Sequence, residues 1–571
     1  IYEQAGYLHI LDPKKAKSSR TAIGVTTDLI ETRPRFVKGS RYVRGSSVSP
    51  AGARAVFEFR GEIVTVPAEK GDPRNITGTA GANERSPMWS PDGKSIAYFS
   101  DESGEYELHV RSQDGKGEVR KFKPGGSGFY DRPVWSPDGE RIAFADNSRS
   151  LYWIELKSGV VKKIASDYQL GPVRGLIVFR TFSPDSKWIV YTLGSKTNLQ
   201  TIYAYSIEQD KSFAVTDGLS EASEPVFDAG GKYLYLFGST DAGPVKQWFD
   251  LSNADMRLTR SLYLIVLRKG IPSPLAKESD EEKGAQKEEK PKPKEESRPE
   301  APEPFTIDFD GIHNRFLALP VPAGDYLNLR AGAAGQIYFI KAAAADTEPG
   351  GQAGPGGELH RYDLAKRKDE IVLNGLTGFE ISADNKKILY AVRDSYFIQP
   401  LSDKIQPGQG KLNIDAVEVR IDPRAEWAQI FDEAWRINRD YFYDPGMHGV
   451  DWNAMKRKYS IFLPDVADRS DLNRVIQWMC SELGVGHHRV LGGDTFSQTR
   501  NVPGGLLGAD YAIENGRYRF KKVYGGLNWN PELRSPLTEP GVDVKAGEYL
   551  LAVQGRDLRP PVNLFGMFEN T

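Results

Sequence analysis

The chain has 571 residues, 39% of them hydrophobic, and a formal net charge of −2. This near-balance of charge produces no strong field for nucleic acid or for a membrane surface, so we expect neither as a partner. The length exceeds what one hydrophobic core supports and predicts about three or four domains. The single cysteine, Cys480, excludes an intramolecular disulfide and a cysteine-rich zinc site.

No apolar run reaches the roughly 18 residues of a membrane-spanning helix. The chain begins at Ile1, with neither a methionine nor a signal-like segment. We therefore expect a fragment that has lost its true N-terminus.

A repeated motif organises the first 400 or so residues. Trp-Ser-Pro-Asp-Gly occurs at residues 89–93 and again 46 residues later at 135–139, each time before an apolar strand. This period is typical of a β-propeller blade. Degenerate copies occur at residues 47–50, 182–185, 226–228 and 381–384, with a weaker one at 329–339. The seven copies predict a seven-bladed β-propeller over residues 41–410.

Each repeat predicts the same local structure: an apolar strand, a turn whose proline and glycine set the backbone angles, and an alternating strand. A third strand is expected to close each blade, and such sheets protect their edges by packing radially. The predicted third strands are residues 62–65, 107–110, 151–154, 202–205, 262–265, 359–362 and 396–398.

Residues 7–12, Tyr-Leu-His-Ile-Leu-Asp, have the third-strand pattern but precede the first turn by too much chain to belong to its blade. We interpret residues 1–40 as the end of a preceding propeller or a linker. The alternative is that this strand closes the visible propeller by pairing with its C-terminal strand.

Two segments interrupt the repeat. Residues 277–304 are almost wholly Glu, Lys, Pro, Asp and Ser, a composition that predicts a disordered insertion from a blade loop. Residues 349–357 are rich in glycine, but no Lys-Ser or Lys-Thr follows them, so we expect a loop and not a phosphate-binding site.

Beyond residue 405 the hydrophobic period becomes helical, which predicts a small helical domain at residues 416–500. Asp422 and Pro423 provide an N-cap and a first-turn proline for a helix to residue 441. A second helix starts at residue 451, and a third runs over residues 470–483 with Ser470 as its cap. Gly484 and Gly486 are expected to end this helix and turn the chain sharply.

Two adjacent histidines, His487 and His488, follow this turn. Imidazole is the usual proton carrier at neutral pH, so either histidine is a candidate general base. Exposed histidines are also commonly without a chemical role. The other histidines are scattered and show no metal-ligand spacing, so we expect no metal and no cofactor.

Residues 501–571 predict short strands and resemble a PDZ domain. The resemblance depends on the Gly-Leu-Leu-Gly loop formed by Gly505, Leu506, Leu507 and Gly508, and on Gly-Glu-Tyr-Leu-Leu-Ala-Val-Gln-Gly at residues 547–555. Backbone amides in such a loop can bind a peptide's terminal carboxylate. A purely structural module is the alternative, and Thr571 falls before the last strand that such a domain needs.

The order of these parts resembles the tricorn protease family, in which two propellers, a helical domain and a PDZ domain precede a catalytic α/β domain. The specific motifs are the Trp-Ser-Pro-Asp-Gly blades, Asp-Pro-Arg-Ala-Glu-Trp from residue 422, Asp-Tyr-Phe-Tyr-Asp from residue 440, the Gly-His pair at 486 and 487, and the Gly-Leu-Leu-Gly loop. The predicted fold is thus mainly β and multidomain, and the fragment lacks the family's first propeller and catalytic domain.

The resemblance implies a serine peptidase that degrades oligopeptides, with the propeller as channel or filter, and a homo-oligomer. His487 is the implied general base, whereas Gly486 stands where the family has an assisting serine. The nucleophile, the glutamate and the oxyanion donors would lie beyond Thr571, so the fragment alone should be inactive. The resemblance favours a cytoplasmic location, with a periplasmic or secreted one as the alternative.

Two other functions remain open at this point. Prolyl oligopeptidase-like enzymes also join a propeller to a hydrolase, but their Gly-x-Ser-x-Gly elbow is absent from this sequence. A scaffold that binds peptides or proteins through propeller and PDZ-like domains, without catalysis, is the non-enzymatic alternative.

Overall fold

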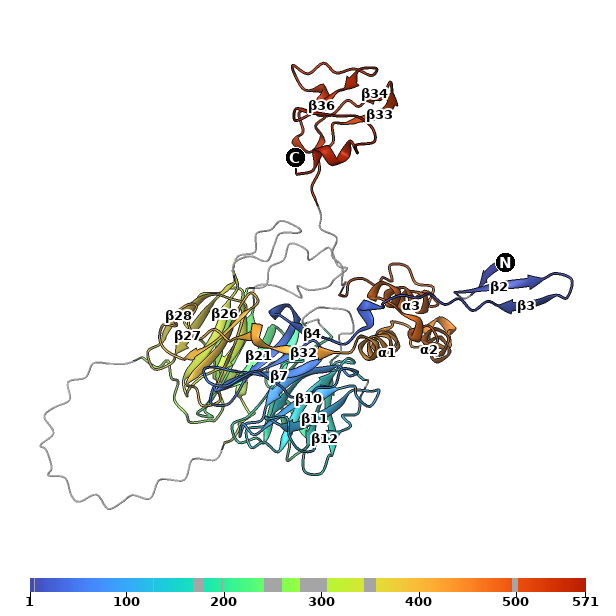
Figure 1. Ribbon diagram of the computed structural model, residues 1–571. Coiled ribbons are helices and arrows are strands. Elements are labelled where there is room, and N and C mark those ends of the chain that lie inside the picture. Colours follow the sequence, from blue (N-terminus) through green and yellow to red (C-terminus); the bar gives the residue numbers. More distant parts are fainter. Residues whose placement is uncertain are drawn as a thin grey trace, which may run out of the picture. The chain divides into compact units, whose positions relative to one another are not determined.

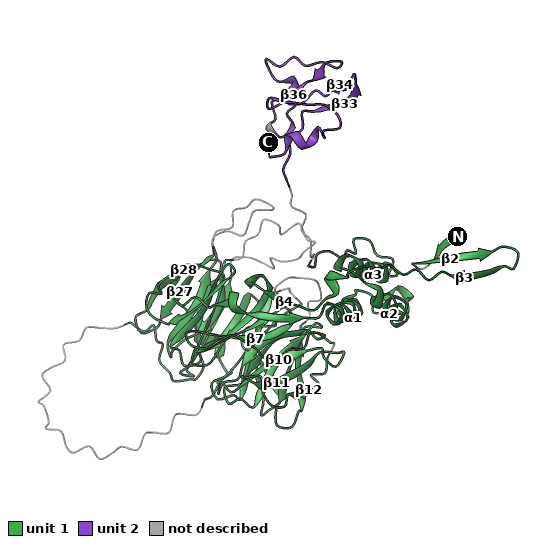
Figure 2. Cartoon of the chain, in the orientation of Figure 1, with its two compact units in different colours: residues 1–492 green, residues 493–571 purple. Residues whose placement is uncertain are grey.

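The computed structural model describes residues 1–4, 6–126, 128–167, 178–196, 199–240, 259–277, 305–343, 356–494 and 502–570. The chain divides into two compact units, residues 1–492 and 493–571 (Figure 2). Nearly all of the predicted charged insertion and of the glycine-rich loop lies outside the described residues. No helix in the described part of the chain is long and apolar enough to cross a membrane.

Seven antiparallel sheets follow one another along the described part of the first unit (Figure 1). The first three are β5 (Val43–Val48), β6 (Arg54–Phe59), β7 (Glu62–Pro67) and β8 (Arg74–Asn75); β9 (Glu84–Trp89), β10 (Ser95–Ser100), β11 (Glu107–Ser112) and β12 (Arg120–Phe122); and β13 (Tyr130–Trp135), β14 (Arg141–Asp146), β15 (Ser150–Glu155) and β16 (Val161–Ser166).

The remaining four sheets continue the order. They are β17 (Arg180–Phe182), β18 (Trp188–Gly194), β19 (Gln200–Ser206) and β20 (Lys211–Ala214); β21 (Glu221–Phe227), β22 (Tyr233–Ser239), β23 (Ser261–Val266) and β24 (Phe316–Ala318); β25 (Tyr326–Ala331), β26 (Gln336–Lys341), β27 (Gly357–Asp363) and β28 (Lys368–Leu376); and β29 (Gly378–Ile381), β30 (Lys387–Val392) and β31 (Ser395–Pro400).

The turn between the first two strands explains the sequence repeat. In the second sheet Ser90 Oγ donates to Asp92 Oδ1 at 2.6 Å and accepts from Ser95 N at 2.9 Å, and Gly93 has φ +70°. The serine thus bridges the ends of the turn, and the glycine supplies its left-handed residue. The same serine and aspartate contacts recur in the third, fourth and seventh sheets.

The third strand is not the last in most sheets, contrary to the expectation that it closes the blade. Each predicted third strand lies within an observed one, but six sheets add a fourth strand, namely β8, β12, β16, β20, β24 and β28. Several of these, such as β8 and β12, are two or three residues long and largely exposed, so they have no apolar pattern that a sequence could reveal.

The N-terminal segment forms a separate three-stranded sheet of β1 (Tyr2–Gln4), β2 (Tyr7–Asp12) and β3 (Lys17–Arg20). Residues 7–12 are therefore a strand, but in the described structure they pair only within this sheet. A later strand, β4 (Arg35–Lys38), instead pairs antiparallel with β32 (Glu418–Ile421), which leads into the helices.

The last sheet packs against the first. Glu380 of β29 accepts hydrogen bonds from Ser47 Oγ and from Val48 N of β5, both at 3.0 Å. Leu389 and Ile398 share one hydrophobic cluster with residues of β5, β6 and β7. Sheets far apart in the sequence are thus neighbours in space.

Three helices complete the first unit: α1 (Pro423–Tyr441), α2 (Trp452–Ser460) and α3 (Arg469–Ser481). The predicted Asp422 cap is present, since its carboxylate accepts from Arg424 N at 3.2 Å. The apolar faces of the helices enclose one core that includes Trp427, Phe431, Trp435, Leu472 and Met479.

Two details of α3 correct the sequence prediction. The cap is Asp468 and not Ser470, because the Asp468 carboxylate reaches Asp471 N at 2.9 Å. After the helix, left-handed backbone occurs at Gly484 (φ +63°) and His487 (φ +63°) but not at Gly486. Gly484 thus has the predicted left-handed conformation, whereas the second such position is His487 and not Gly486.

The second unit has a sheet of β33 (Ala509–Glu514), β34 (Arg517–Val523) and β35 (Tyr549–Leu550), and a hairpin of β36 (Ala552–Val553) and β37 (Arg556–Asp557). Its small core contains Val553, Leu558 and Leu564. Near the C-terminus the chain forms one 3-10 turn, Phe565–Phe568.

Glu84 of β9 is a buried carboxyl group, 1% exposed. Its Oε1 accepts from Thr79 Oγ1 at 2.6 Å and from Ser100 Oγ at 3.2 Å. Burial raises the pKa of Glu84 from 4.5 to about 8. The pKa of Glu84 is therefore higher in the folded protein than in the unfolded chain, so protonated Glu84 favours the folded state. This contribution to the free energy of unfolding is fully present below about pH 4.5 and is lost as the pH rises through 8.

We therefore expect Glu84→Gln to flatten the pH dependence of stability. Between pH 5 and 8.5 the wild-type free energy of unfolding should fall by roughly 1–4 kcal/mol more than that of the variant. Urea unfolding at several pH values checks this, with Glu118→Gln, at an exposed position, as the matched control. Parallel pH curves for wild type and Glu84→Gln would contradict a raised pKa.

Candidate functional site

The predicted general base lies in the loop that follows α3. His487 is exposed, and His488 is half-buried. Neither imidazole has a hydrogen-bond partner among the described residues, so no carboxylate of this part of the chain orients either ring. The loop presents an accessible imidazole on a left-handed turn, which is an uncommon backbone for a residue other than glycine.

His488, and not His487, lines a cavity of about 520 Å³ beside this loop. The cavity lies between α1, α3, β32 and the loops at residues 60–62 and 80–83. Its walls are mixed: Ile430, Val490 and Leu491 contribute apolar surface, and Asn83 and Glu433 contribute polar groups. The histidine pair thus lies at the edge of a concave site built by the helices and the first two sheets.

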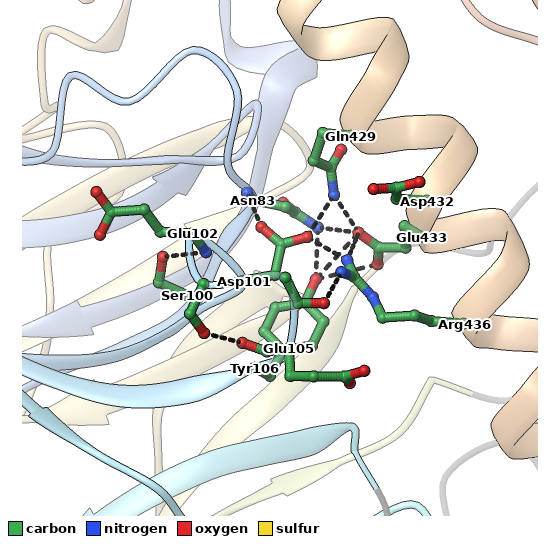
Figure 3. Close-up of polar contacts among 12 residues, drawn as sticks. Asn83, Ser100, Asp101, Glu102, Glu105, Tyr106, Gln429, Asp432, Glu433 and Arg436 are labelled. Atoms are coloured by element: carbon green, nitrogen blue, oxygen red, sulfur yellow. Dashed lines mark hydrogen bonds and ion pairs between the residues drawn. The ribbon is translucent and has the colours of Figure 1, made fainter. Parts of the chain in front are cut away.

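A buried polar network holds α1 against the second sheet (Figure 3). Arg436 forms an ion pair with Asp101, and both side chains are almost fully buried. Glu433 accepts from Tyr106 Oη at 3.0 Å and from Asn83 Nδ2 at 2.9 Å. Burial, and then the Glu433 charge, raise the pKa of Tyr106, so its hydroxyl remains a donor.

A second ion pair fixes the start of α1. Arg60, in the turn between β6 and β7, donates through Nε and Nη2 to the two carboxylate oxygens of Glu426 at 2.8 and 3.0 Å. This bidentate geometry is the stronger form of an arginine–carboxylate contact. The wall of the cavity is therefore anchored at both of its ends.

The sequence analysis missed this network. A signal was available, because Gln429, Glu433 and Arg436 recur at i, i+4 and i+7 and form a polar stripe beside the apolar face of α1. Such a stripe ordinarily faces solvent. Here it faces Asp101 and Tyr106, and this long-range pairing is not encoded in local spacing.

Other groups near the histidines are already engaged. Burial raises the pKa of the Cys480 thiol to about 11, so it is no thiolate nucleophile at neutral pH. Glu482 accepts from Lys458 Nζ at 2.6 Å and from Tyr459 Oη at 2.5 Å, and these contacts, the Lys458 bond first, lower its pKa. It is thus a structural carboxylate within the helical domain.

His448 is also structural in this arrangement. Its Nδ1 lies 2.9 Å from the Leu483 carbonyl oxygen and its Nε2 lies 2.5 Å from Tyr443 Oη. The ring therefore connects the segment after α1 to the end of α3, just before the histidine loop. Both ring nitrogens have partners, as expected for a hydrogen-bonded surface group.

In the second unit, the predicted peptide-binding loop precedes β33. Gly505 N donates to the Phe568 carbonyl at 2.9 Å, so this amide serves an internal contact. The amides of Leu506, Leu507 and Gly508 make no hydrogen bond within the described residues. Leu506 is 72% exposed. Three of the four predicted loop residues thus retain amides that could bind a carboxylate.

The first strands of all seven sheets line one central cavity of about 1230 Å³. Its wall is rich in charge, with arginine and glutamate side chains contributed by several sheets. The charged lining residues are Arg44, Glu58, Arg85, Asp131, Arg132, Arg180, Glu221, Glu224, Arg260, Arg330 and Glu380.

Comparison with known proteins gives three matches in chain order. The tricorn protease second beta propeller domain matches residues 43–402, the tricorn protease C1 domain residues 423–481, and the tricorn protease PDZ domain residues 505–571. The chain therefore has the class of architecture in which a β-propeller domain is joined to a small helical domain and a PDZ domain. It belongs to the tricorn protease family.

Individual relatives agree with this assignment. Tricorn protease homolog 1 of Streptomyces coelicolor is 29% identical over 98% of this chain and 53% of its own length. The tricorn protease of Thermoplasma volcanium is 22% identical over 97% of this chain and 51% of its own. A crystal structure of the tricorn protease superposes with a TM-score of 0.74 at 21% identity, over 99% of this chain and 52% of that one.

These proportions give the scale of the match. The chain spans about half the length of the curated relatives it matches. The shared half comprises the second propeller, C1 and PDZ domains. His487 lies in the short segment between the matched C1 and PDZ domains.

Proposed function

We propose that the full-length protein is a serine peptidase that degrades oligopeptides, and that this chain supplies its general base, His487. The observation that carries the proposal is the succession of three tricorn protease domains, with an exposed histidine directly after the C1 domain. The relatives that share this succession are named as tricorn proteases. Burial raises the pKa of Cys480, the single cysteine of this chain, and so argues against its thiol as the nucleophile.

The proposed chemistry is acyl transfer. His487 takes the proton of a serine hydroxyl as the oxygen attacks the peptide carbonyl, and then returns that proton to the leaving amine. The serine, its assisting glutamate and the oxyanion donors are assigned to the sequence beyond Thr571. An unpaired, exposed imidazole suits this role, because it leaves both ring nitrogens available to partners from another domain.

We further propose that the seven sheets form one closed, seven-bladed propeller whose central cavity is the route or filter for peptides. The contacts of Glu380 with Ser47 and Val48 support closure between the last and first sheets. The shared cavity supports a common axis. A homo-oligomer with peptide substrates as partners completes the proposal, and light scattering of the full-length protein tests its oligomeric state.

A non-catalytic peptide scaffold is the second candidate. It is favoured by the amides of Leu506, Leu507 and Gly508, which make no hydrogen bond within the described structure. In this function the PDZ domain would capture a peptide terminus, and the propeller would hold a partner.

Incubation of the full-length protein with unfolded oligopeptides and with a folded protein distinguishes the two functions. Mass spectrometry should find the oligopeptides cleaved at internal or terminal bonds, with the folded protein intact. Peptides that bind at micromolar concentration but are returned uncut would contradict the peptidase and favour the scaffold.

A further inference from the structure

The charged wall of the central cavity divides into two groups that differ in their partners. Three of the carboxylates bind backbone amides of neighbouring sheets: Glu58 accepts from Ser86 N at 3.0 Å, Glu224 from Leu329 N at 2.8 Å, and Glu380 from Val48 N at 3.0 Å. These acids therefore tie one sheet to the next. Burial also raises the pKa of Glu58 and of Glu380, the latter to about 7, which reduces their negative charge.

Two of these ties, to Ser86 N and to Leu329 N, meet an irregularity in the first strands. Pairing shifts by a bulge in β9, β13, β21 and β25, and a residue at each bulge has left-handed backbone: Ser86 (φ +54°), Arg132 (φ +30°), Glu224 (φ +51°) and Asn328 (φ +61°). A bulge leaves an amide without its ladder partner and redirects side chains. Strained backbone of this kind is concentrated at functional positions.

Three arginines of the wall form no ion pair with these three glutamates in the described structure. The Arg132 side chain has no hydrogen bond or ion pair in the described structure and is exposed to the cavity. Arg330 donates to the Leu329 carbonyl, and no carboxylate of the described residues lies within ion-pair distance of it. Arg180 is 5% exposed, donates to Asp131 and to backbone carbonyls, and retains a buried Nε without a partner.

These three guanidinium groups affect one another although they come from β13, β17 and β25. Burial is the largest cause and lowers the pKa of both Arg180 and Arg330. The positive charge of Arg132 also lowers both, whereas Asp131 raises the pKa of Arg180, and Glu224 and Glu380 raise that of Arg330. Like charges gathered in a cavity favour an anion, and guanidinium groups match the planar geometry of a carboxylate. Glu224 and Glu380 also accept hydrogen bonds from backbone amides, whereas Asp131 pairs with Arg180.

We propose that Arg132, Arg180 and Arg330 form an anion-binding site in the central cavity that receives the carboxylate of an acidic peptide. The inference rests on the proposed route of peptides through this cavity and adds a preference for charge. Glutamate or aspartate side chains, or a peptide's terminal carboxylate, share the required chemistry.

The test uses binding and not hydrolysis, so its failure is distinguishable from a failure of the peptidase proposal. Calorimetry would measure the binding of four N-acetylated hexapeptides to the 571-residue chain. Three have an amidated C-terminus and alternate Ala with Glu, Gln or Lys. The fourth is the Ala-Gln peptide with a free C-terminal carboxylate. The amidated terminus removes the carboxylate that the loop at residues 505–508 would bind.

We expect the amidated Ala-Glu peptide to bind about tenfold more tightly than the amidated Ala-Gln peptide. Arg132→Gln should abolish most of this preference, and Arg132→Lys should retain it. Arg393→Gln is the matched control, because Arg393 is an exposed arginine with left-handed backbone (φ +51°) that does not line the cavity. If only the free-terminus Ala-Gln peptide binds more tightly, and Arg132→Gln removes this difference, the site binds the terminal carboxylate of a peptide.

Equal binding of the Ala-Glu peptide and of both Ala-Gln peptides, or tighter binding of the Lys peptide, would overturn the anion site. A Glu preference that survives Arg132→Gln would also overturn it. Arg330→Gln provides a second variant should Arg132→Gln fail to fold, and thermal melting of each variant checks the fold.

Discussion

Replacement of Arg436 by methionine is expected to destabilise the first unit by about 3–5 kcal/mol. The guanidinium is 3% exposed and pairs with Asp101, whose side chain is 1% exposed. It also donates to the Gly104 carbonyl at 2.5 Å. Removal of Arg436 leaves the Asp101 charge buried without its main partner, and this desolvated carboxylate is the physical reason for the large loss.

Urea unfolding followed by tryptophan fluorescence measures this effect, since Trp427 and Trp435 lie in the core of the helices. Arg457→Met is the control, because Arg457 is 70% exposed and lies 3.9 Å from Asp451. We expect its loss to stay below about 1 kcal/mol. An Arg436→Met loss of that same small size would show that the ion pair does not hold α1 against the second sheet.

The double variant with Asp101→Asn sharpens this result. If the two groups stabilise the fold through each other, the combined loss should be clearly smaller than the sum of the single losses. Strict additivity would instead assign the effect of each residue to separate contacts.

The largest expected effect on activity comes from His487. In the full-length protein, His487→Ala should lower kcat/KM for an oligopeptide by at least about 1,000-fold, because a general base is lost from the acyl-transfer step. His488→Ala should lower it by less than about tenfold. His488 lines the neighbouring cavity and is not assigned to proton transfer.

A second variant separates the imidazole from the turn that it makes. His487 has φ +63°, a conformation that asparagine tolerates better than alanine. His487→Asn should therefore preserve the loop and still lose the activity. Full activity in either His487 variant, or a larger loss in His488→Ala, would contradict the assignment.

Local sequence signals predicted the parts of the fold that depend on local chemistry. The turn at Ser90, Asp92 and Gly93 could be predicted from the sequence because each of these residue types has a distinct role in a turn and the three lie within a few positions of one another. The start of α1 was predictable for the same reason, from Asp422 and Pro423. Confirmed membership of the tricorn protease family matches the resemblance carried by these motifs.

Long-range features were not predictable in this way. The contacts of Asp101 with Arg436 and of Glu380 with Val48 join residues more than 300 positions apart, and no spacing along the chain indicates them. The two- and three-residue fourth strands β8 and β12 lack a hydrophobic pattern. The turn at His487 was misplaced because glycine at 486 was the stronger local signal, whereas the histidine adopts the left-handed conformation.

The central claim is that His487 serves a serine nucleophile in the same protein, and an active-site-directed fluorophosphonate tests it most directly. After treatment of the full-length protein, digestion and mass spectrometry should find one modified serine beyond residue 571, and His487→Asn should slow its modification severely. Efficient peptide hydrolysis without any serine modification, or equally fast modification in His487→Asn, would contradict the account.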